Sequence, residues 1–200
     1  TNNQTMPTTL LAGGSGLIGR RLSELLRAQG HMVRNLTRSP GGAGQFAWNP
    51  ATGTLDEAAL RDVDAVINLA GAGIADRRWT PARKRELIES RVQSAKTLHD
   101  AFLRTGHRPK VYLSASAIGY YGNSGERPMA ETDAPVDHSF MVDCCRQWES
   151  AADGIAGIGI RTVKLRIGVV LDKAGGALAE FVKPLRFGVG AYFSDGAAWY

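Results

Sequence analysis

Apolar residues along the chain fall into two alternating patterns: short unbroken runs, and longer stretches with a period of three to four residues. The unbroken runs at 8–12 and 65–69 are typical of parallel strands that are buried on both faces. A helical pattern follows the first run and ends near Gly30, and a longer helix is expected from Thr80, a good N-cap residue, to Gly106. Weaker patterns predict strands at 31–37, 45–48, 110–114 and 160–170, and helices at 56–60, 143–152 and 177–186.

Strands and helices therefore alternate along most of the chain. This order predicts an α/β fold, a Rossmann-like, doubly wound and mostly parallel sheet with helices on both faces. Within 160–170 the apolar residues alternate with polar ones, which indicates a strand with one less buried face. A chain of 200 residues is long enough for one good-sized domain with a real core.

The turn between the first strand and the first helix is rich in glycine. Its spacing fits both Gly14-x-Gly16-x-x-Gly19 and Gly13-x-x-Gly16-x-x-Gly19, two patterns of dinucleotide-binding proteins. Such glycines allow a tight turn and a close approach of the backbone to a pyrophosphate, which the helix N-terminus also attracts. The sequence therefore predicts a cofactor site formed by the residues of this turn, Gly13, Gly14, Ser15, Gly16, Leu17, Ile18 and Gly19.

The end of the second strand selects between the two nicotinamide cofactors. An acidic residue there would bind the ribose 2′-hydroxyl of NAD, but this chain has Thr37 followed by Arg38. A guanidinium binds a 2′-phosphate through two parallel hydrogen bonds, so Arg38 favours NADP(H) over NAD(H). The alternative for Arg38 is an exposed loop arginine. A second small-residue loop, Leu69-Ala70-Gly71, ends the strand at 65–69 and is also expected to contact the cofactor.

The composition argues against a membrane-spanning or disulfide-rich protein. No apolar run approaches the roughly 20 residues of a membrane helix, and no signal peptide is visible. The two cysteines, Cys144 and Cys145, form neither a disulfide framework nor a metal cluster, and they suit a reducing compartment. We expect a cytoplasmic protein without a membrane partner, and leave open an organelle-targeting segment upstream of residue 1.

The formal net charge is +5, and part of it is concentrated at 77–85. A basic patch can bind nucleic acid, but no base-reading module accompanies this one. A solvated helix face or a polyanionic cofactor is favoured over a nucleic-acid partner.

Several motifs together resemble a known family. The glycine turn, Asn68-Leu-Ala-Gly71 and Ser114-Ala-Ser116 resemble extended or atypical short-chain dehydrogenase/reductases of the NAD-dependent epimerase/dehydratase group. Further motifs resemble its "epimerase family protein" subgroup, the 39U type of this superfamily: Arg77-Arg-Trp-Thr80, Ser90-Arg91, Ser116-Ala-Ile-Gly-Tyr-Tyr-Gly122, Gln147-Trp-Glu149 and Arg166-Ile-Gly-Val-Val-Leu171.

The resemblance covers nearly the whole chain and implies a domain organisation. Such proteins run to about 300 residues, a nucleotide-binding domain followed by a smaller C-terminal substrate lobe. We therefore expect a disordered or tag-like segment at 1–7, an NADP-binding Rossmann domain at 8–172, and at 173–200 the start of a substrate lobe that is largely missing.

The resemblance also implies a catalytic set of serine or threonine, tyrosine and lysine. The tyrosine exchanges a proton with a substrate hydroxyl while hydride moves to or from the nicotinamide. Ser116 matches the serine, but the tyrosine and lysine positions fall on Met141 and Cys145, which cannot do this chemistry. Tyr120 and Tyr121 are the candidates for a substitute proton donor, with packing of two aromatic rings as the alternative.

Glu86 and Arg91, on the long helix, fall at positions that resemble cofactor contacts in the subgroup, with solvent exposure as the alternative. Two functions remain open. One is an NADP(H)-dependent oxidoreductase or nucleotide-sugar epimerase-like enzyme with a non-standard active site. The other is a catalytically silent NADP(H)-binding sensor or scaffold. The expected partner is a small-molecule substrate, with nucleotide sugars as one candidate class, and the sequence indicates no oligomeric state.

Overall fold

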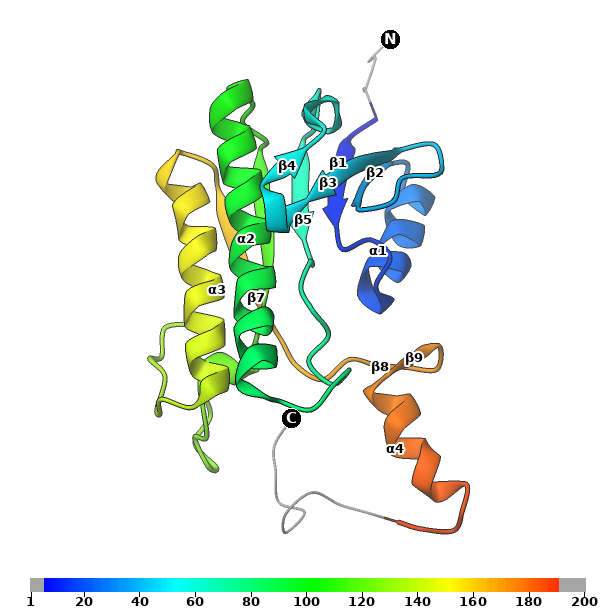
Figure 1. Cartoon of the computed structure of the whole chain (residues 1–200), viewed down its shortest axis with the longest axis vertical. Helices are drawn as coiled ribbons and strands as arrows, with labels where there is room; N and C mark the ends of the chain where they lie inside the picture. The colour runs from blue at the N-terminus through cyan, green and yellow to red at the C-terminus, as the bar shows by residue number, and fades with distance from the viewer. Residues whose placement is uncertain (1–5, 191–200) are drawn as a thin grey trace.

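The computed structural model describes residues 6–190 and contains a seven-stranded sheet with helices on both faces (Figure 1). Its main elements are β1 (Thr8–Ala12), α1 (Leu17–Ala28), β2 (Met32–Thr37), β3 (Gln45–Asn49), β4 (Thr54–Leu55), β5 (Ala65–Asn68), α2 (Pro81–Thr105), β6 (Val111–Ala117), α3 (Phe140–Gly157), β7 (Thr162–Ile167), β8 (Leu171–Asp172), β9 (Gly175–Gly176) and α4 (Ala177–Leu185). Short 3-10 helices span Pro50–Thr52, Glu57–Leu60 and Ile118–Tyr120.

The strand order confirms the predicted doubly wound sheet. It runs β4-β3-β2-β1-β5-β6-β7, and every pairing is parallel except that of the short edge strand β4 with β3. Strands β2, β3 and β4 are added in turn on one side of β1, and β5, β6 and β7 on the other side. The strand order therefore reverses between β1 and β5, and ligands of such sheets bind at the carboxyl ends of the strands on either side of this switch point.

Alternate side chains of β1 enter two different cores. Leu11 belongs to a small core with Val33 and Ile67, against which Leu22 and Leu26 of α1 pack. Leu10 belongs to the larger core on the opposite face, where Leu98 and other residues of α2 and α3 are buried. The helices α2 and α3 run side by side over that face (Figure 1). The two-residue period of a strand thus places apolar side chains on both faces, as the unbroken run at 8–12 predicts.

Several element boundaries differ from the sequence prediction. The helix expected at 143–152 begins at Phe140 and continues to Gly157, because its core contacts outweigh the low helix propensity of the glycines near its end. The strand expected at 160–170 is only Thr162–Ile167, since its partner β6 ends in register with it at Ala117. The strand expected at 110–114 is Val111–Ala117, and the helix expected at 56–60 is the 3-10 helix Glu57–Leu60.

After β7, the chain forms a small hairpin of β8 and β9 and then α4, which the sequence predicted at 177–186. The hairpin and the edge strand β4 were not predicted, because two-residue strands leave no recognisable period. The assignment of 173–200 to a second lobe stays a prediction, and residues 191–200 of it lie outside the described residues, as do residues 1–5 of the segment 1–7. Among residues 6–190, no helix combines the length and the apolar character needed to cross a membrane.

Candidate functional site

The glycine turn connects the carboxyl end of β1 to α1, and its backbone packs closely against Leu69, Asn35 and the start of α1. Gly13 has a φ of +82°, and a Cβ atom there would lie 2.8 Å from the carbonyl carbon of Leu69. A Cβ atom on Gly14 would overlap the side chain of Asn35, and one on Gly19 would lie 2.7 Å from the Cα atom of Gly14. Side chains at these positions would push the strand, the turn and the helix apart.

The first turn of α1 is open to an anion. Its N-cap, Gly16, makes no side-chain hydrogen bond, and no acidic residue lies in the first turn. The backbone N–H groups at the start of a helix have no acceptor within the helix. The helix dipole also has its positive end there, which favours binding of a phosphate. Beneath the turn, Asn35 Oδ1 is buried without a hydrogen-bond partner among the described residues. The close backbone of the turn and the free N–H groups of the helix N-terminus fit a dinucleotide pyrophosphate on Gly13–Gly19. The Asn35 oxygen is an acceptor and does not contribute to binding a phosphate.

Arg38 lies at the same end of the sheet. It follows β2, which pairs in parallel with β1 in the register Ala12 to Leu36, so both strands end side by side. The hydroxyl of Thr37 accepts a hydrogen bond from the Ser39 amide at 3.3 Å and shapes the turn that carries Arg38. Within residues 6–190, the exposed Arg38 side chain has neither a hydrogen bond nor an ion pair, so its guanidinium is free to bind a ligand.

The loop after β5 lies next to the glycine turn, because β5 pairs in parallel with β1 on the side opposite β2. Asn68 Oδ1 accepts a hydrogen bond from the Ala70 amide at 3.0 Å, and this shapes Leu69-Ala70-Gly71. A Cβ atom on Gly71 would lie 3.0 Å from the guanidinium carbon of Arg91, so the arginine lies directly against the loop.

Arg91 carries a charge that the fold itself leaves unbalanced. Its Nη1 donates to the Leu87 carbonyl at 2.8 Å, and its guanidinium lies 4.8 Å from the centre of the Trp148 ring. No carboxylate pairs with Arg91 among the described residues, and burial lowers its pKa. A half-buried cation beside the Gly71 loop, with no carboxylate partner among the described residues, is suited to bind an anion.

Glu86 is engaged differently. Its carboxylate lies 2.8 Å from Arg83 Nη1 and 3.6 Å from Arg77 Nη2, and the hydrogen bond with Arg83 lowers the pKa of Glu86. The structure therefore shows Glu86 inside an ion-pair group at the start of α2, where the Thr80 hydroxyl caps the helix as predicted.

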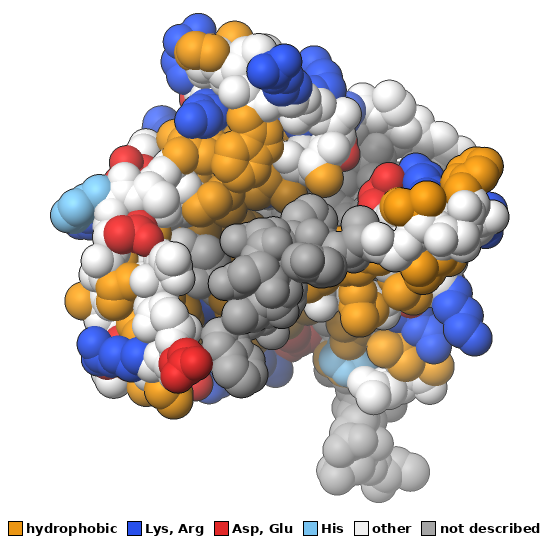
Figure 2. Space-filling view, turned by 90° about the horizontal axis from the view of Figure 1, so that it is seen from below, with side chains coloured by type: hydrophobic (Ala, Val, Ile, Leu, Met, Phe, Trp, Pro, Cys, Tyr) orange, Lys and Arg blue, Asp and Glu red, His pale blue; other side chains and the backbone are white. Residues whose placement is uncertain are grey.

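Figure 2 shows the end of the molecule on which these loops lie, where apolar side chains are bordered by lysine and arginine. The exposed Trp79 packs edge-on against Phe140 with ring centres 5.2 Å apart, and Lys84 Nζ lies 5.0 Å from the Phe140 ring. Arg83 is buried as well, so at least two of the basic residues at 77–85, Arg83 and Lys84, make contacts within the protein.

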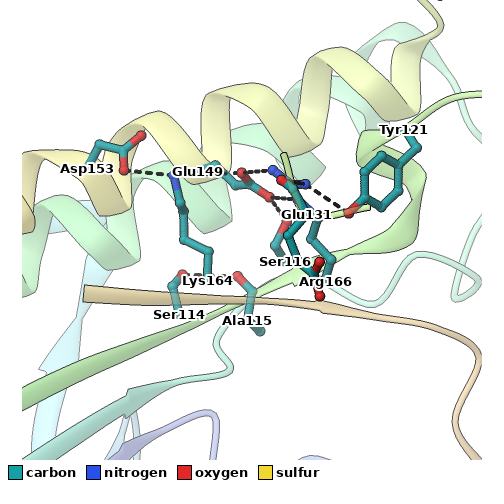
Figure 3. Close-up of polar contacts among 9 residues, drawn as sticks. All are labelled: Ser114, Ala115, Ser116, Tyr121, Glu131, Glu149, Asp153, Lys164 and Arg166. Carbon is teal, nitrogen blue, oxygen red and sulfur yellow. Dashed lines mark hydrogen bonds and ion pairs between the residues drawn. The ribbon is translucent and has the colours of Figure 1, made fainter. Parts of the chain in front are cut away.

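Two of the candidate catalytic residues, Ser116 and Tyr121, belong to one polar cluster between β6, β7 and α3 (Figure 3). The buried Ser116 donates its hydroxyl to Glu149 Oε1 at 2.7 Å. Arg166 donates to both Glu149 oxygens, from Nε at 2.9 Å and from Nη2 at 3.0 Å. Arg166 Nη1 also donates to Tyr121 Oη at 3.0 Å, and the guanidinium lies over the Tyr120 ring. The structure thus brings Ser116, Tyr120 and Tyr121 together through Glu149 and Arg166.

Sequence reasoning quoted Glu149 and Arg166 only as parts of motifs and assigned them no role. A signal was present, because Lys164 and Arg166 share one face of a strand whose other face is apolar. Two cations on the covered face of a strand require an acidic partner, and Glu149 on the covering helix supplies it.

The model of the NAD dependent epimerase/dehydratase family matches residues 9–141, from β1 through the glycine turn to the start of α3. The chain belongs to this family.

Curated members of the family are similar over nearly the whole chain. An epimerase family protein of Mycobacterium bovis is 41% identical over 187 residues, which cover 93% of this chain and 61% of the relative. The human epimerase family protein SDR39U1 is 33% identical over 193 residues, covering 96% of this chain and 64% of the relative. The chain therefore spans less than two thirds of the length of these relatives.

Solved structures of the epimerase/dehydratase type match the fold closely. The crystal structure of human SDR39U1 (isoform 2) with NADPH has a TM-score of 0.82 and 31% identity, and it covers 96% of this chain and 64% of that chain. A nucleoside-diphosphate sugar epimerase from Corynebacterium glutamicum also has a TM-score of 0.82, with 29% identity, over 98% of this chain and 40% of that one. The fold is that of an NAD(P)-binding, epimerase-like protein.

The positions that the resemblance assigns to the family tyrosine and lysine lie on α3. Met141 is half-buried there, and Cys145 is 1% exposed. Burial raises the pKa of the Cys145 thiol to about 11, so the thiol is neutral at physiological pH and offers no nucleophile. Neither residue can exchange a proton with a substrate in the way a tyrosine with an adjacent lysine does.

Proposed function

We propose that the protein binds NADP(H) and acts as an oxidoreductase or nucleotide-sugar epimerase-like enzyme with a non-standard active site. The observation that carries the proposal is the glycine turn, where close backbone approach and an uncapped helix N-terminus meet beside the free guanidinium of Arg38. The human relative crystallised with NADPH supports the same cofactor.

In this proposal, each part of the dinucleotide is bound by a different group of residues. The amides of Gly13–Gly19 bind the pyrophosphate, Thr37 and Arg38 bind the 2′-phosphate, and Leu69-Ala70-Gly71 lies along the ribose and nicotinamide. Arg91 supplies a positive charge beside Gly71, and Glu86 is a further candidate contact from α2. When bound there, the nicotinamide would supply the hydride acceptor or donor of the reaction.

Calorimetry with NADPH and NADH tests the cofactor. Removing a charged hydrogen-bond partner of a phosphate costs about 1.5–3 kcal/mol, which is roughly a 10- to 100-fold loss of affinity. Arg38→Ala should therefore weaken NADPH binding by this factor and leave NADH binding unchanged.

Arg161→Ala is the matched control, because Arg161 is also exposed but precedes β7 at the opposite edge of the sheet. Equal NADPH affinity of wild type and Arg38→Ala would contradict the role of Arg38. Absence of binding of either dinucleotide to the wild-type protein would reject the cofactor proposal as a whole.

The catalytic part of the proposal assigns substrate orientation to Ser116 and proton transfer to Tyr120 or Tyr121. A small hydroxyl-bearing substrate is proposed, with nucleotide sugars as the first class to test because a similar structure is that of a nucleoside-diphosphate sugar epimerase. The proposed location is the cytoplasm.

Loss of a general acid typically lowers a rate by about 10²–10⁴-fold. In an assay that follows nicotinamide absorbance with UDP-sugars, Tyr121→Phe should therefore react about 10²–10⁴-fold more slowly than wild type.

A catalytically silent NADP(H)-binding sensor or scaffold is the second candidate. It is favoured by Met141 and the neutral thiol of Cys145 at the positions where the resemblance implies the tyrosine and lysine. The absorbance assay separates the two, since a sensor binds NADPH with unchanged affinity in Ser116→Ala and turns over no nucleotide sugar in any variant.

A further inference from the structure

Arg166 lies at the carboxyl end of β7 and joins three parts of the chain (Figure 3). Two of its nitrogens donate to the Glu149 carboxylate on α3, at 2.9 and 3.0 Å. The third nitrogen, Nη1, donates to Tyr121 Oη and to the Glu131 carbonyl oxygen in the loop after β6, both at 3.0 Å. Because a guanidinium is planar and rigid, the two bonds to Glu149 fix the direction in which Nη1 meets the Tyr121 oxygen.

Glu149 explains why Arg166 keeps this position. Its carboxylate is 4% exposed, and a buried carboxylate requires charged or hydrogen-bonding partners, here Arg166 and the Ser116 hydroxyl. The hydrogen bond to Glu149 raises the pKa of Arg166, so its guanidinium carries a full positive charge at every physiological pH. A permanent charge is thus held at a fixed place beside the loop after β6.

The two tyrosines of that loop meet this charge in different ways. Tyr120 presents the face of its ring, whose centre lies 3.5 Å from the guanidinium carbon. Tyr121 also has its ring centre near the guanidinium carbon, at 4.9 Å, but it alone accepts a hydrogen bond on its oxygen, and its ring stands edge-on to that of Tyr120 with centres 5.6 Å apart. A cation on a ring face stabilises packing, whereas a cation at the phenolic oxygen stabilises negative charge on that atom.

We propose that Arg166 positions Tyr121 and supplies the charge for its proton transfer, in place of the lysine that the family resemblance implies. This inference rests on the proposed function and deepens it, because it selects Tyr121 rather than Tyr120. In the oxidative direction, the Tyr121 phenolate takes the hydroxyl proton of a secondary alcohol. The hydride on the same carbon passes to an oxidised nicotinamide dinucleotide. The products are a ketone, neutral Tyr121 and the reduced dinucleotide, and Arg166 keeps its proton throughout.

Other charged groups around the cluster point elsewhere. Lys164 Nζ, on β7, lies 2.8 Å from Asp153 and 3.8 Å from Glu149, both on α3. Asp137, beside Gly122, accepts hydrogen bonds from the Asn123 and Ser139 amides at 2.8 Å. Among residues 6–190, Arg166 is the only charged side chain that forms a hydrogen bond with the Tyr121 oxygen.

A double-mutant cycle in urea unfolding tests the contact without any substrate. Tyr121→Phe is made in wild type and in the double variant Glu149→Gln/Arg166→Gln, which removes both charges of the pair. A hydrogen bond to a charged group is worth roughly 10- to 100-fold in an equilibrium constant, so Tyr121→Phe should shift the unfolding equilibrium of wild type by at least about tenfold and that of the double variant much less. In the absorbance assay with UDP-sugars, the double variant should lower kcat by about 10²–10⁴-fold, as Tyr121→Phe does, and the two changes together should lower it no further.

Tyr120→Phe is the control, because it keeps the ring under the guanidinium and should shift the unfolding equilibrium equally in both backgrounds. Circular dichroism of each variant verifies that it is folded. An equal shift by Tyr121→Phe with and without the charged pair would overturn the inference, as would a shift by Tyr120→Phe that depends on the pair to the same degree. NADPH calorimetry on wild type tests the proposed function separately, since the unfolding cycle needs no cofactor.

Discussion

Replacing Gly19 by alanine tests the close packing on which the cofactor site depends. Gly19 is buried in the first turn of α1, and an added Cβ atom would lie 2.7 Å from the Gly14 Cα atom and 2.9 Å from the Gly14 carbonyl carbon. Those neighbours are backbone atoms, so no side chain can rotate away to make room. Either α1 must move away from β1 or the glycine turn must deform, and overpacking of this kind typically costs about 1–3 kcal/mol.

The same substitution at Gly154 is the matched control. Gly154 is in α3, and among the described residues no atom beyond its chain neighbours and its own helix backbone lies within 4 Å of the position its Cβ would take. Glycine to alanine in an exposed helix stabilises the folded state by about 0.5–1 kcal/mol. The difference in the free energy of unfolding between Gly19→Ala and Gly154→Ala therefore isolates the steric term, expected at about 1–3 kcal/mol.

Urea unfolding followed by circular dichroism measures both variants, and calorimetry measures their affinity for NADPH. Gly154→Ala should bind like wild type. Gly19→Ala should bind at least about tenfold more weakly, because displacing the turn removes one or more amide contacts to a phosphate, each about 1.5–3 kcal/mol. If Gly19→Ala were as stable as Gly154→Ala and bound NADPH with wild-type affinity, the argument from close approach would be wrong.

Two other predictions follow from buried titratable groups. Burial raises the pKa of Cys145 to about 11 and also raises that of Cys144, so neither thiol should react with a disulfide reagent in the folded protein at neutral pH, whereas both should react in urea. A thiol that reacts quickly before unfolding would contradict this. Although burial alone would raise the pKa of Glu149, hydrogen bonds from Arg166 and Ser116 lower it below the value in the unfolded chain. The stability contributed by Glu149 is then complete above that unfolded value and is lost as the pH falls through the folded one, so acidification should destabilise wild type more steeply than Glu149→Gln/Arg166→Gln in urea unfolding at a series of pH values.

The fold and the glycine turn could be predicted because their signals are local. A strand, a turn of fixed spacing and a helix follow one another within 8–28, and the structure gives a steric reason for Gly13, Gly14 and Gly19, although not for Gly16. The extent of α3 could not be predicted, because Gly154 and Gly157 argue against a helix locally while Ile155 between them is buried in the core. Tertiary packing decided that boundary.

The charged cluster could not be predicted because it depends on register. Ser116 on β6 pairs directly with Arg166 on β7, so their side chains emerge on the same face of the sheet, under α3. Nothing in the sequence fixes that register, and 50 positions separate the two residues. Glu149 and Arg166 occur in two separate sequence motifs, and only the folded structure shows that their side chains are in contact.

The exchange of a lysine for an arginine in the proposed role changes what the charge can do. A lysine can release a proton when its surroundings favour the neutral amine, whereas a guanidinium does not deprotonate in proteins. Arg166 is also bonded to Glu149 through two nitrogens, which raises its pKa still further. It can therefore stabilise charge on Tyr121 but cannot relay a proton from it. The proton that Tyr121 accepts in each oxidation must leave through solvent or substrate, and Tyr121 is only half-buried, which leaves it a route to solvent. Ser116 is buried and already donates its own proton to Glu149, so its remaining capacity is to accept a hydrogen bond. A substrate hydroxyl has a single proton, so the hydroxyl that gives its proton to Tyr121 does not also donate to Ser116. Ser116 can accept a hydrogen bond only from a second donor of the substrate, such as a neighbouring hydroxyl group.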